Sequence, residues 1–141
     1  MAFSEVYGAL QTGVVDGQEN TWSNIYGKKF FEVQDGSTAT NHGIIDYLLV
    51  TSTEWLAGLD ADVRDQFLTI VAEVTDLRNG ESTRINAEAR AAIEAAGGVV
   101  RDLTPDQRQA WVDAMMPVWD MFEGDVGADN IAAAQAINAN Y

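Results

Sequence analysis

Residues 18–20, the polar run Gln-Glu-Asn, are the part of this sequence whose side chains best suit ligand binding. They follow the turn dipeptide Asp16-Gly17 directly and are rich in hydrogen-bonding groups. The amide of Asn20 can donate to one carboxylate oxygen while its own oxygen accepts from a neighbouring cation. Glu19 could orient such a cation, although a solvated acidic residue beside a turn is an equally good interpretation. The alternative role of Asn20 is to cap a helix that begins near Thr21.

The sequence indicates neither a catalytic site nor a metal site. It holds no nucleophile elbow, no phosphate-binding glycine loop and no HExxH pattern. Asp16 and Glu19 would share a face only on a helix, and Gly17 lies between them. His42 is the only histidine and has no second imidazole or thiol at ligand spacing, so a structural role is its default. We therefore expect a protein that is not an enzyme and that uses no metal or cofactor.

Composition limits the partners of the chain. Its 141 residues carry a net charge of −14, with 47% hydrophobic and 21% charged residues, as expected for one folded domain. Such an acidic surface repels phosphate backbones, which argues against nucleic-acid binding, and any carboxylate ligand would need a local cation. No apolar run reaches the roughly 18 residues that span a bilayer. The sequence has no cysteine, and its N-terminus lacks the pattern of a signal peptide.

Helical patterns on both sides position the polar run. The apolar residues before it are spaced as one buried helical face that Gly13 ends, namely Phe3, Val6, Tyr7 and Leu10. After it, helical spacing resumes with Trp22, Tyr26, Phe30 and Val33. We therefore expect residues 18–20 to lie in a loop between two helices, where binding residues often lie. From spacing alone, Phe3 and Trp22 would pack against other helices.

Residues 38–51 predict a long strand. They are rich in β-branched and aromatic residues, and residues 44–50 form a nearly continuous apolar run typical of a strand buried on both faces. Because the usual strand is much shorter, two strands joined at Gly43 are the alternative.

The longest helix is predicted to begin after Asp60 as its cap and to reach about residue 96. Apolar residues recur at helical steps on both sides of Asn79-Gly80, at Val63, Phe67, Ile70, Val74, Leu77, Ile85, Ala89 and Ile93. A continuous helix would be roughly 55 Å long, and Gly80 would cost it only about 1 kcal/mol. Two antiparallel helices broken at Asn79-Gly80 are the alternative.

Shorter elements flank this helix. A short helix capped by Ser52 or Thr53 precedes it, and a short edge strand at Val99-Val100 follows it. Thr104-Pro105 predicts the start of another helix, with Thr as the cap and Pro at the first helical position. The alanine-rich residues 128–137 predict a terminal helix.

Three strings in the first third of the chain resemble a known family. They are FSEVYGALQTGVVDGQEN at residues 3–20, KKFFEVQ at residues 28–34 and TNH at residues 40–42. They resemble the extracytoplasmic solute receptors of TRAP transporters, the DctP family, and the later helical stretches to about residue 123 resemble it more loosely. Only the C-terminal half of such a receptor is matched. We therefore expect a fragment that lacks the signal segment and the first lobe.

The resemblance implies the fold class. Family members are two-lobed α/β proteins, so the chain is expected to be the helix-rich C-terminal part of one, with a long lobe-spanning helix and a long crossing strand. Residues 1–45 would form part of the second lobe and carry the segment that faces the ligand. Residues 46–141 would supply the crossing strand, the connecting helix and the C-terminal helices.

The resemblance also implies site residues. In the family, the Asn that corresponds to Asn20 helps to hold a ligand carboxylate beside an arginine, which here would lie outside the 141 residues. Phe3 would contact the apolar body of the ligand, and Glu19 would orient the arginine. Trp22, followed by Ser-Asn-Ile-Tyr, resembles members associated with C4-dicarboxylates. His42 would border the ligand cleft.

The function that the resemblance implies is periplasmic binding of a small organic acid, a C4-dicarboxylate, for delivery to TRAP membrane permease subunits. The alternative is a non-binding structural fragment that self-associates through exposed strand edges and apolar helix faces. Its partner would then be the missing N-terminal lobe or another copy of the chain.

Overall fold

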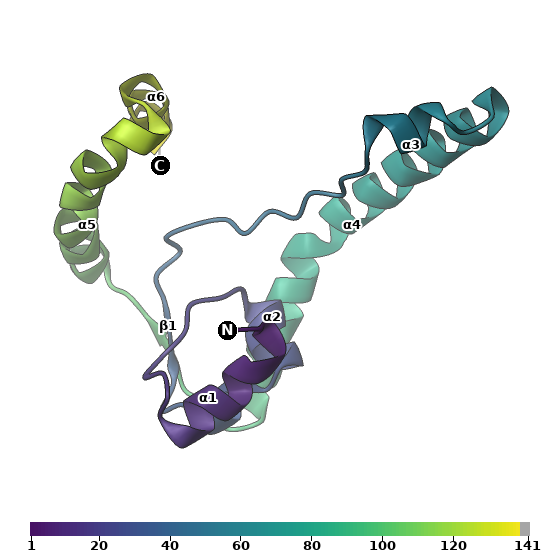
Figure 1. The fold of residues 1–141 in the computed structure, drawn as a ribbon. Helices are drawn as coiled ribbons and strands as arrows, with labels where there is room; N and C mark the ends of the chain where they lie inside the picture. The colour runs from purple at the N-terminus through teal and green to yellow at the C-terminus, as the bar shows by residue number, and fades with distance from the viewer. Residues whose placement is uncertain (139–141) are drawn as a thin grey trace. The chain divides into compact units, whose positions relative to one another are not determined.

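Helices make up most of the chain in the computed structural model, which describes residues 1–138 (Figure 1). The chain divides into two units, Met1–Arg101 and Asp102–Tyr141. No helix within residues 1–138 combines the length and the apolar character needed to cross a membrane.

The N-terminal helix forms where the apolar spacing predicts it. A 3₁₀ turn, η1 (Phe3–Glu5), leads into α1 (Val6–Thr12), which buries Leu10. Gly13 ends α1 in the left-handed conformation, with φ of 71°, where a residue without Cβ meets little steric penalty. The chain that follows is irregular as far as Thr21, as predicted for the polar run.

The second helix is shorter than its spacing predicts. We expected one helix from Trp22 to Val33, but α2 (Trp22–Gly27) stops there and a 3₁₀ turn, η2 (Phe30–Val33), follows. Between them Lys29 has φ of 58°, a left-handed conformation that ends the α-helical hydrogen bonding. The break turns Phe30 fully into the core, where its side chain has no exposed surface.

The predicted long strand is mostly absent. β1 covers only Ser37–Ala39 and pairs with β2 (Val100–Asp102), one residue beyond the strand expected at Val99-Val100. Residues 40–52 have no regular secondary structure, so the prediction for them is wrong. A strand needs a neighbour to receive its backbone hydrogen bonds, and no second strand pairs with this stretch within the described part of the chain. The apolar side chains that we expected to be buried, such as Ile44 and Leu48, are more than four-fifths exposed, at 87% and 85%.

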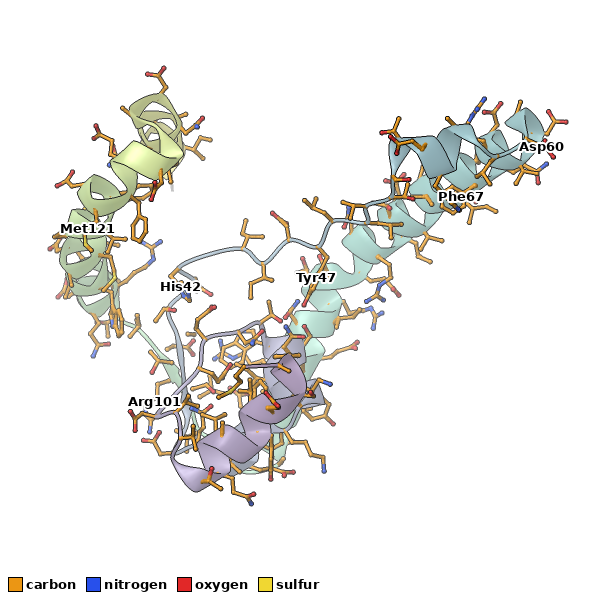
Figure 2. The ribbon with its side chains drawn as sticks, in the orientation of Figure 1. His42, Tyr47, Asp60, Phe67, Arg101 and Met121 are labelled. Carbon is orange, nitrogen blue, oxygen red and sulfur yellow. The ribbon has the colours of Figure 1, made fainter. Side chains whose placement is uncertain are left out.

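The longest predicted helix is confirmed. α4 (Ala61–Ala95) runs through Asn79-Gly80 without a break, so the antiparallel alternative is wrong. Its 35 residues correspond to about 52 Å. Before it lies α3 (Thr53–Ala57), capped by Ser52, whose Oγ accepts from Trp55 N. Trp55 of α3 packs edge to face on Phe67 of α4, with ring centroids 5.5 Å apart. Figure 2 labels Phe67, on the part of α4 that lies beside α3.

One small core holds the N-terminal elements against the end of α4. Its buried members come from α1, α2, η2 and α4, and are Leu10, Ile25, Phe30 and Ile93. Partly buried side chains surround them, namely Val6, Tyr7, Val15, Trp22, Phe31, Val33 and Val100. The loop that carries residues 18–20 is therefore anchored at both ends to packed helices.

The second unit holds two helices. α5 (Pro105–Val126) begins with the predicted capping box, in which Thr104 and Gln107 exchange side-chain and backbone hydrogen bonds. α6 (Ala128–Asn138) matches the predicted terminal helix and buries Ile131. A pocket of about 320 Å³ lies on these helices, and none of the candidate site residues lines it; its walls are Met115, Val118, Trp119, Phe122, Val126 and Ile131.

Candidate functional site

Asn20 lies partly buried in the loop that precedes α2. Its Oδ1 accepts two hydrogen bonds, from Thr21 N at 3.2 Å and from Asn24 Nδ2 at 2.6 Å. Within residues 1–138, the Nδ2 group of Asn20 has no hydrogen-bond acceptor. Half of this amide is therefore used locally, and the other half can donate to a ligand.

Asn20 is not the helix cap that the alternative interpretation required. The cap of α2 is Thr21, whose Oγ1 accepts from Asn24 N at 3.4 Å. One further contact attaches the start of α2 to α4. Asn86 Oδ1 accepts from Ser23 N at 3.1 Å, and within α4 the Nδ2 group of the same Asn86 donates to the carbonyl of Ser82 at 3.0 Å. The long helix thus holds the first turn of α2 in place.

Glu19 and His42 come together although they are 23 positions apart in the sequence. His42 Nε2 lies 3.3 Å from Glu19 Oε2, and Thr40 Oγ1 lies 2.7 Å from His42 Nδ1. Both side chains are exposed, so their pairing contributes little stability even when the imidazole is protonated. In the part of the chain that the structure describes, no three His, Asp or Glu side chains are arranged to hold a metal ion.

The two aromatic candidates both have packing partners. Phe3 meets Phe30 edge to face at 5.6 Å between ring centroids, and Lys28 Nζ lies 5.6 Å from the Phe3 ring. Phe3 is nonetheless 43% exposed, which leaves part of its surface for a further contact. Trp22 packs against the core, and the Arg90 guanidinium lies 5.5 Å from its ring.

Gln18 has a feature that the sequence did not reveal. Its Nε2 donates to Gln34 Oε1 at 3.3 Å, while its own Oε1 is buried without a hydrogen-bond partner. An unpaired buried acceptor costs roughly 1–3 kcal/mol. Only the fold reveals it, because Gln34 comes from the other side of η2.

Asn24 and Tyr47 were also missed. Asn24 Nδ2 donates to Tyr47 Oη at 3.3 Å as well as to Asn20 Oδ1. Figure 2 labels Tyr47, on the segment between β1 and α3. The sequence shows that Asn24 lies four residues after Asn20. This spacing indicates a contact between the two side chains only when Thr21, and not Asn20, is the cap of α2. The apolar run at residues 44–50 predicts a buried Tyr47, but Tyr47 is 81% exposed.

Tyr7 forms an electrostatic contact within the same packed region. Its hydroxyl donates to Glu32 Oε2 at 3.2 Å. Removal from solvent, the hydrogen bond to Glu32 and the negative charge of that carboxylate together raise the pKa of Tyr7 above its ordinary value of 10.0, and Lys29 acts against them. The contact joins α1 to η2, the two elements that flank the loop and α2.

The chain is similar to proteins of known function over nearly its whole length. The family model for bacterial extracellular solute-binding proteins, family 7 (DctP), matches residues 1–125. The C4-dicarboxylate-binding periplasmic protein DctP of Vibrio cholerae is 64% identical over 138 residues, and that of Rhodobacter capsulatus is 44% identical over 140 residues. These matches cover 98% and 99% of this chain but only 42% of each relative, so the chain spans less than half of their length.

Solved structures agree with these matches. A TRAP periplasmic solute-binding protein from Shewanella oneidensis with bound succinate has a TM-score of 0.91 and 44% identity, over 96% of this chain and 45% of its own. A corresponding protein from Pseudomonas aeruginosa with bound L-malate has a TM-score of 0.81 and 38% identity, over 85% of this chain and 42% of its own. These similarities confirm the predicted fold class, the helix-rich part of a two-lobed receptor.

Proposed function

The chain belongs to the DctP family of bacterial extracellular solute-binding proteins, family 7, and from this premise we propose that it is the part of a TRAP receptor that binds a C4-dicarboxylate for uptake. The observation that carries the proposal is its similarity, along almost all of its residues, to a C4-dicarboxylate-binding protein. On this proposal the complete protein works in the periplasm, delivers its ligand to membrane permease subunits and is not an enzyme.

Asn20 is the proposed carboxylate contact. Its Nδ2 group is available, and an amide N–H donated to a carboxylate is a charge-assisted hydrogen bond of the stronger kind. The acidic chain does not attract an anion by its overall field, so the ligand charge also needs a cation. The family resemblance assigns that role to an arginine outside these residues.

The other candidates have supporting roles in this proposal. The exposed part of Phe3 would pack on the apolar carbons of the ligand. Glu19 and His42, already in contact, would border the cleft, and Trp22 would support the loop from the core side. We also propose that residues 1–45 carry the ligand-facing segment and that residues 46–141 connect the lobes.

Replacing Asn20 tests the proposal. Asn20→Ala should weaken succinate binding at least about tenfold, as expected for loss of a hydrogen bond to a charged group. Isothermal titration calorimetry on the complete protein measures the affinity. Asn79→Ala is the matched control, because Asn79 is an exposed amide in the middle of α4. Unchanged affinity in Asn20→Ala would remove Asn20 from the site and leave the proposal without its contact.

A second candidate function is self-association without ligand. The observation that favours it is the extended segment at residues 44–50, whose apolar side chains are exposed and whose backbone is unpaired; Tyr47, Leu48, Leu49 and Val50 are each at least 80% exposed. Such a stretch can pair with another chain. Light scattering and a succinate titration on one sample separate the candidates, since a monomer that binds succinate contradicts this one.

A further inference from the structure

The orientation of the Asn20 amide is determined by its neighbours. Thr21 N–H is a backbone group that can only donate, so the group facing it must be the oxygen of Asn20. Asn24 Nδ2 donates to the same oxygen at 2.6 Å. With two donors on Oδ1, the NH₂ group of Asn20 is turned away from both of them.

The orientation of Asn24 is determined in turn. Its Nδ2 group carries two hydrogens and has two acceptors, Asn20 Oδ1 and Tyr47 Oη. Its backbone belongs to the first turn of α2, capped by Thr21 and followed by Ile25, which is only 5% exposed. Asn86 holds the neighbouring Ser23 N–H from α4. Because this turn is already fixed, the Asn24 side chain loses little further conformational entropy when it donates to Asn20.

We propose that Asn24 is a positioning residue that keeps the Asn20 amide oriented with its NH₂ group toward the ligand, and so selects carboxylates over groups that can only donate. The inference rests on the proposed function of Asn20. Without the Asn24 donor, only the 3.2 Å hydrogen bond from Thr21 N would hold the oxygen of Asn20, and rotation of the amide by half a turn, which presents that oxygen to the ligand, would be opposed less strongly. An oxygen facing a carboxylate repels it, so the affinity depends on Asn24 even though Asn24 need not touch the ligand.

The test is a double-mutant cycle in the complete protein, with succinate as the probe and calorimetry as the readout. Asn24→Leu removes the donor without adding charge, and it should weaken succinate binding about threefold to tenfold when Asn20 is present. In an Asn20→Ala background the same change should alter the affinity by less than about twofold, because the group that Asn24 orients is gone. Loss of affinity through damage to the fold would instead persist in both backgrounds.

A second variant guards against misfolding. Asn24→Asp has almost the same shape, and a carboxylate in the first turn of a helix is favourable for the helix, so α2 should be retained. It replaces the donor by an acceptor and should weaken binding more than Asn24→Leu does. Ser23→Ala is the matched control, since the Ser23 hydroxyl contacts Thr21 Oγ1 and not Asn20.

The outcomes separate this inference from the proposed function. If Asn20→Ala weakens binding but both Asn24 variants act equally in the two backgrounds, or not at all, Asn24 does not position Asn20 and the inference is overturned. If Asn20→Ala itself leaves the affinity unchanged, the proposed carboxylate contact fails as well.

Discussion

The two halves of α4 have the same sequence pattern and opposite surroundings. In the packed half, residues 81–95, Ala89 and Ile93 are 6% and 0% exposed. In the open half, residues 61–80, Val63, Ile70 and Leu77 are 52%, 57% and 62% exposed. α2 packs along the packed half, whereas the open half has the short α3 beside it (Figure 1).

The difference in exposure between the two halves shows that helix formation and burial in a core have separate causes. Spacing at three and four residues sets which side chains share a face, and it predicts the helix in both halves. Burial of that apolar face depends on a second helix or turn that packs against it with apolar side chains of its own. The packed half has Leu10, Ile25 and Phe30 as such partners.

The largest expected effect is on the core of the packed half. In the 141-residue chain, Ile93→Ala should lower the free energy of unfolding by about 2–5 kcal/mol, because it opens a cavity beside Phe30. Leu77→Ala, the matched change in the open half, should cost less than about 0.5 kcal/mol. Urea denaturation measures both, and equal losses would contradict the comparison.

Two glycine substitutions test the same comparison between the halves of α4. Their expected effects on stability are intermediate in size and opposite in sign. A Cβ at Gly98, just beyond the packed end, would lie 2.6 Å from Ile93 Cγ2 and 3.0 Å from the Ile93 carbonyl oxygen. Gly98→Ala should therefore cost about 1–3 kcal/mol through overpacking.

Gly80 is the counterpart at the edge of the open half, with no heavy atom within 4 Å of an added Cβ. Gly80→Ala should stabilise the chain by about 0.5–1 kcal/mol, since alanine favours the helix more. Thermal unfolding of the two variants should move in opposite directions. A loss of stability in Gly80→Ala would mean that this part of α4 is covered.

The smallest effect is a pH dependence confined to the packed region. The raised pKa of Tyr7 means that the folded chain favours the protonated phenol more than the unfolded chain does. Its contribution to stability is therefore complete below about pH 10 and is lost as the pH rises through the folded pKa. Stability measured at about pH 9 and about pH 11 should fall less in Tyr7→Phe than in the unmodified chain. Identical losses would show that the contact with Glu32 does not matter.

The helices were predictable because their causes are local. The continuous α4 follows from apolar spacing and from the small cost of Gly80, and the start of α5 follows from Thr104 and Pro105. The irregular loop at residues 18–20 was expected from Gly13 and Gly17. Membership of the family was predictable from the strings at residues 3–42.

The failures have non-local causes. The end of α2 depends on Lys29 adopting a left-handed conformation, which lets Phe30 enter the core. Residues 40–52 have strand-like composition, but composition cannot supply a neighbouring strand. At the candidate site, the sequence identified Asn20 but not which half of its amide is in use, because that depends on Asn24 and on where the helix cap lies.

The pairing of β1 with β2 closes residues 40–99 into one long loop whose two ends lie side by side. Its far tip lies at Gly58–Asp60, between α3 and α4. The entropy of closing a loop grows only with the logarithm of its length, so added residues at that tip change the closure cost little. The tip is therefore a natural place to attach a fluorophore or to insert a reporter domain while the loop around Asn20 keeps its supports.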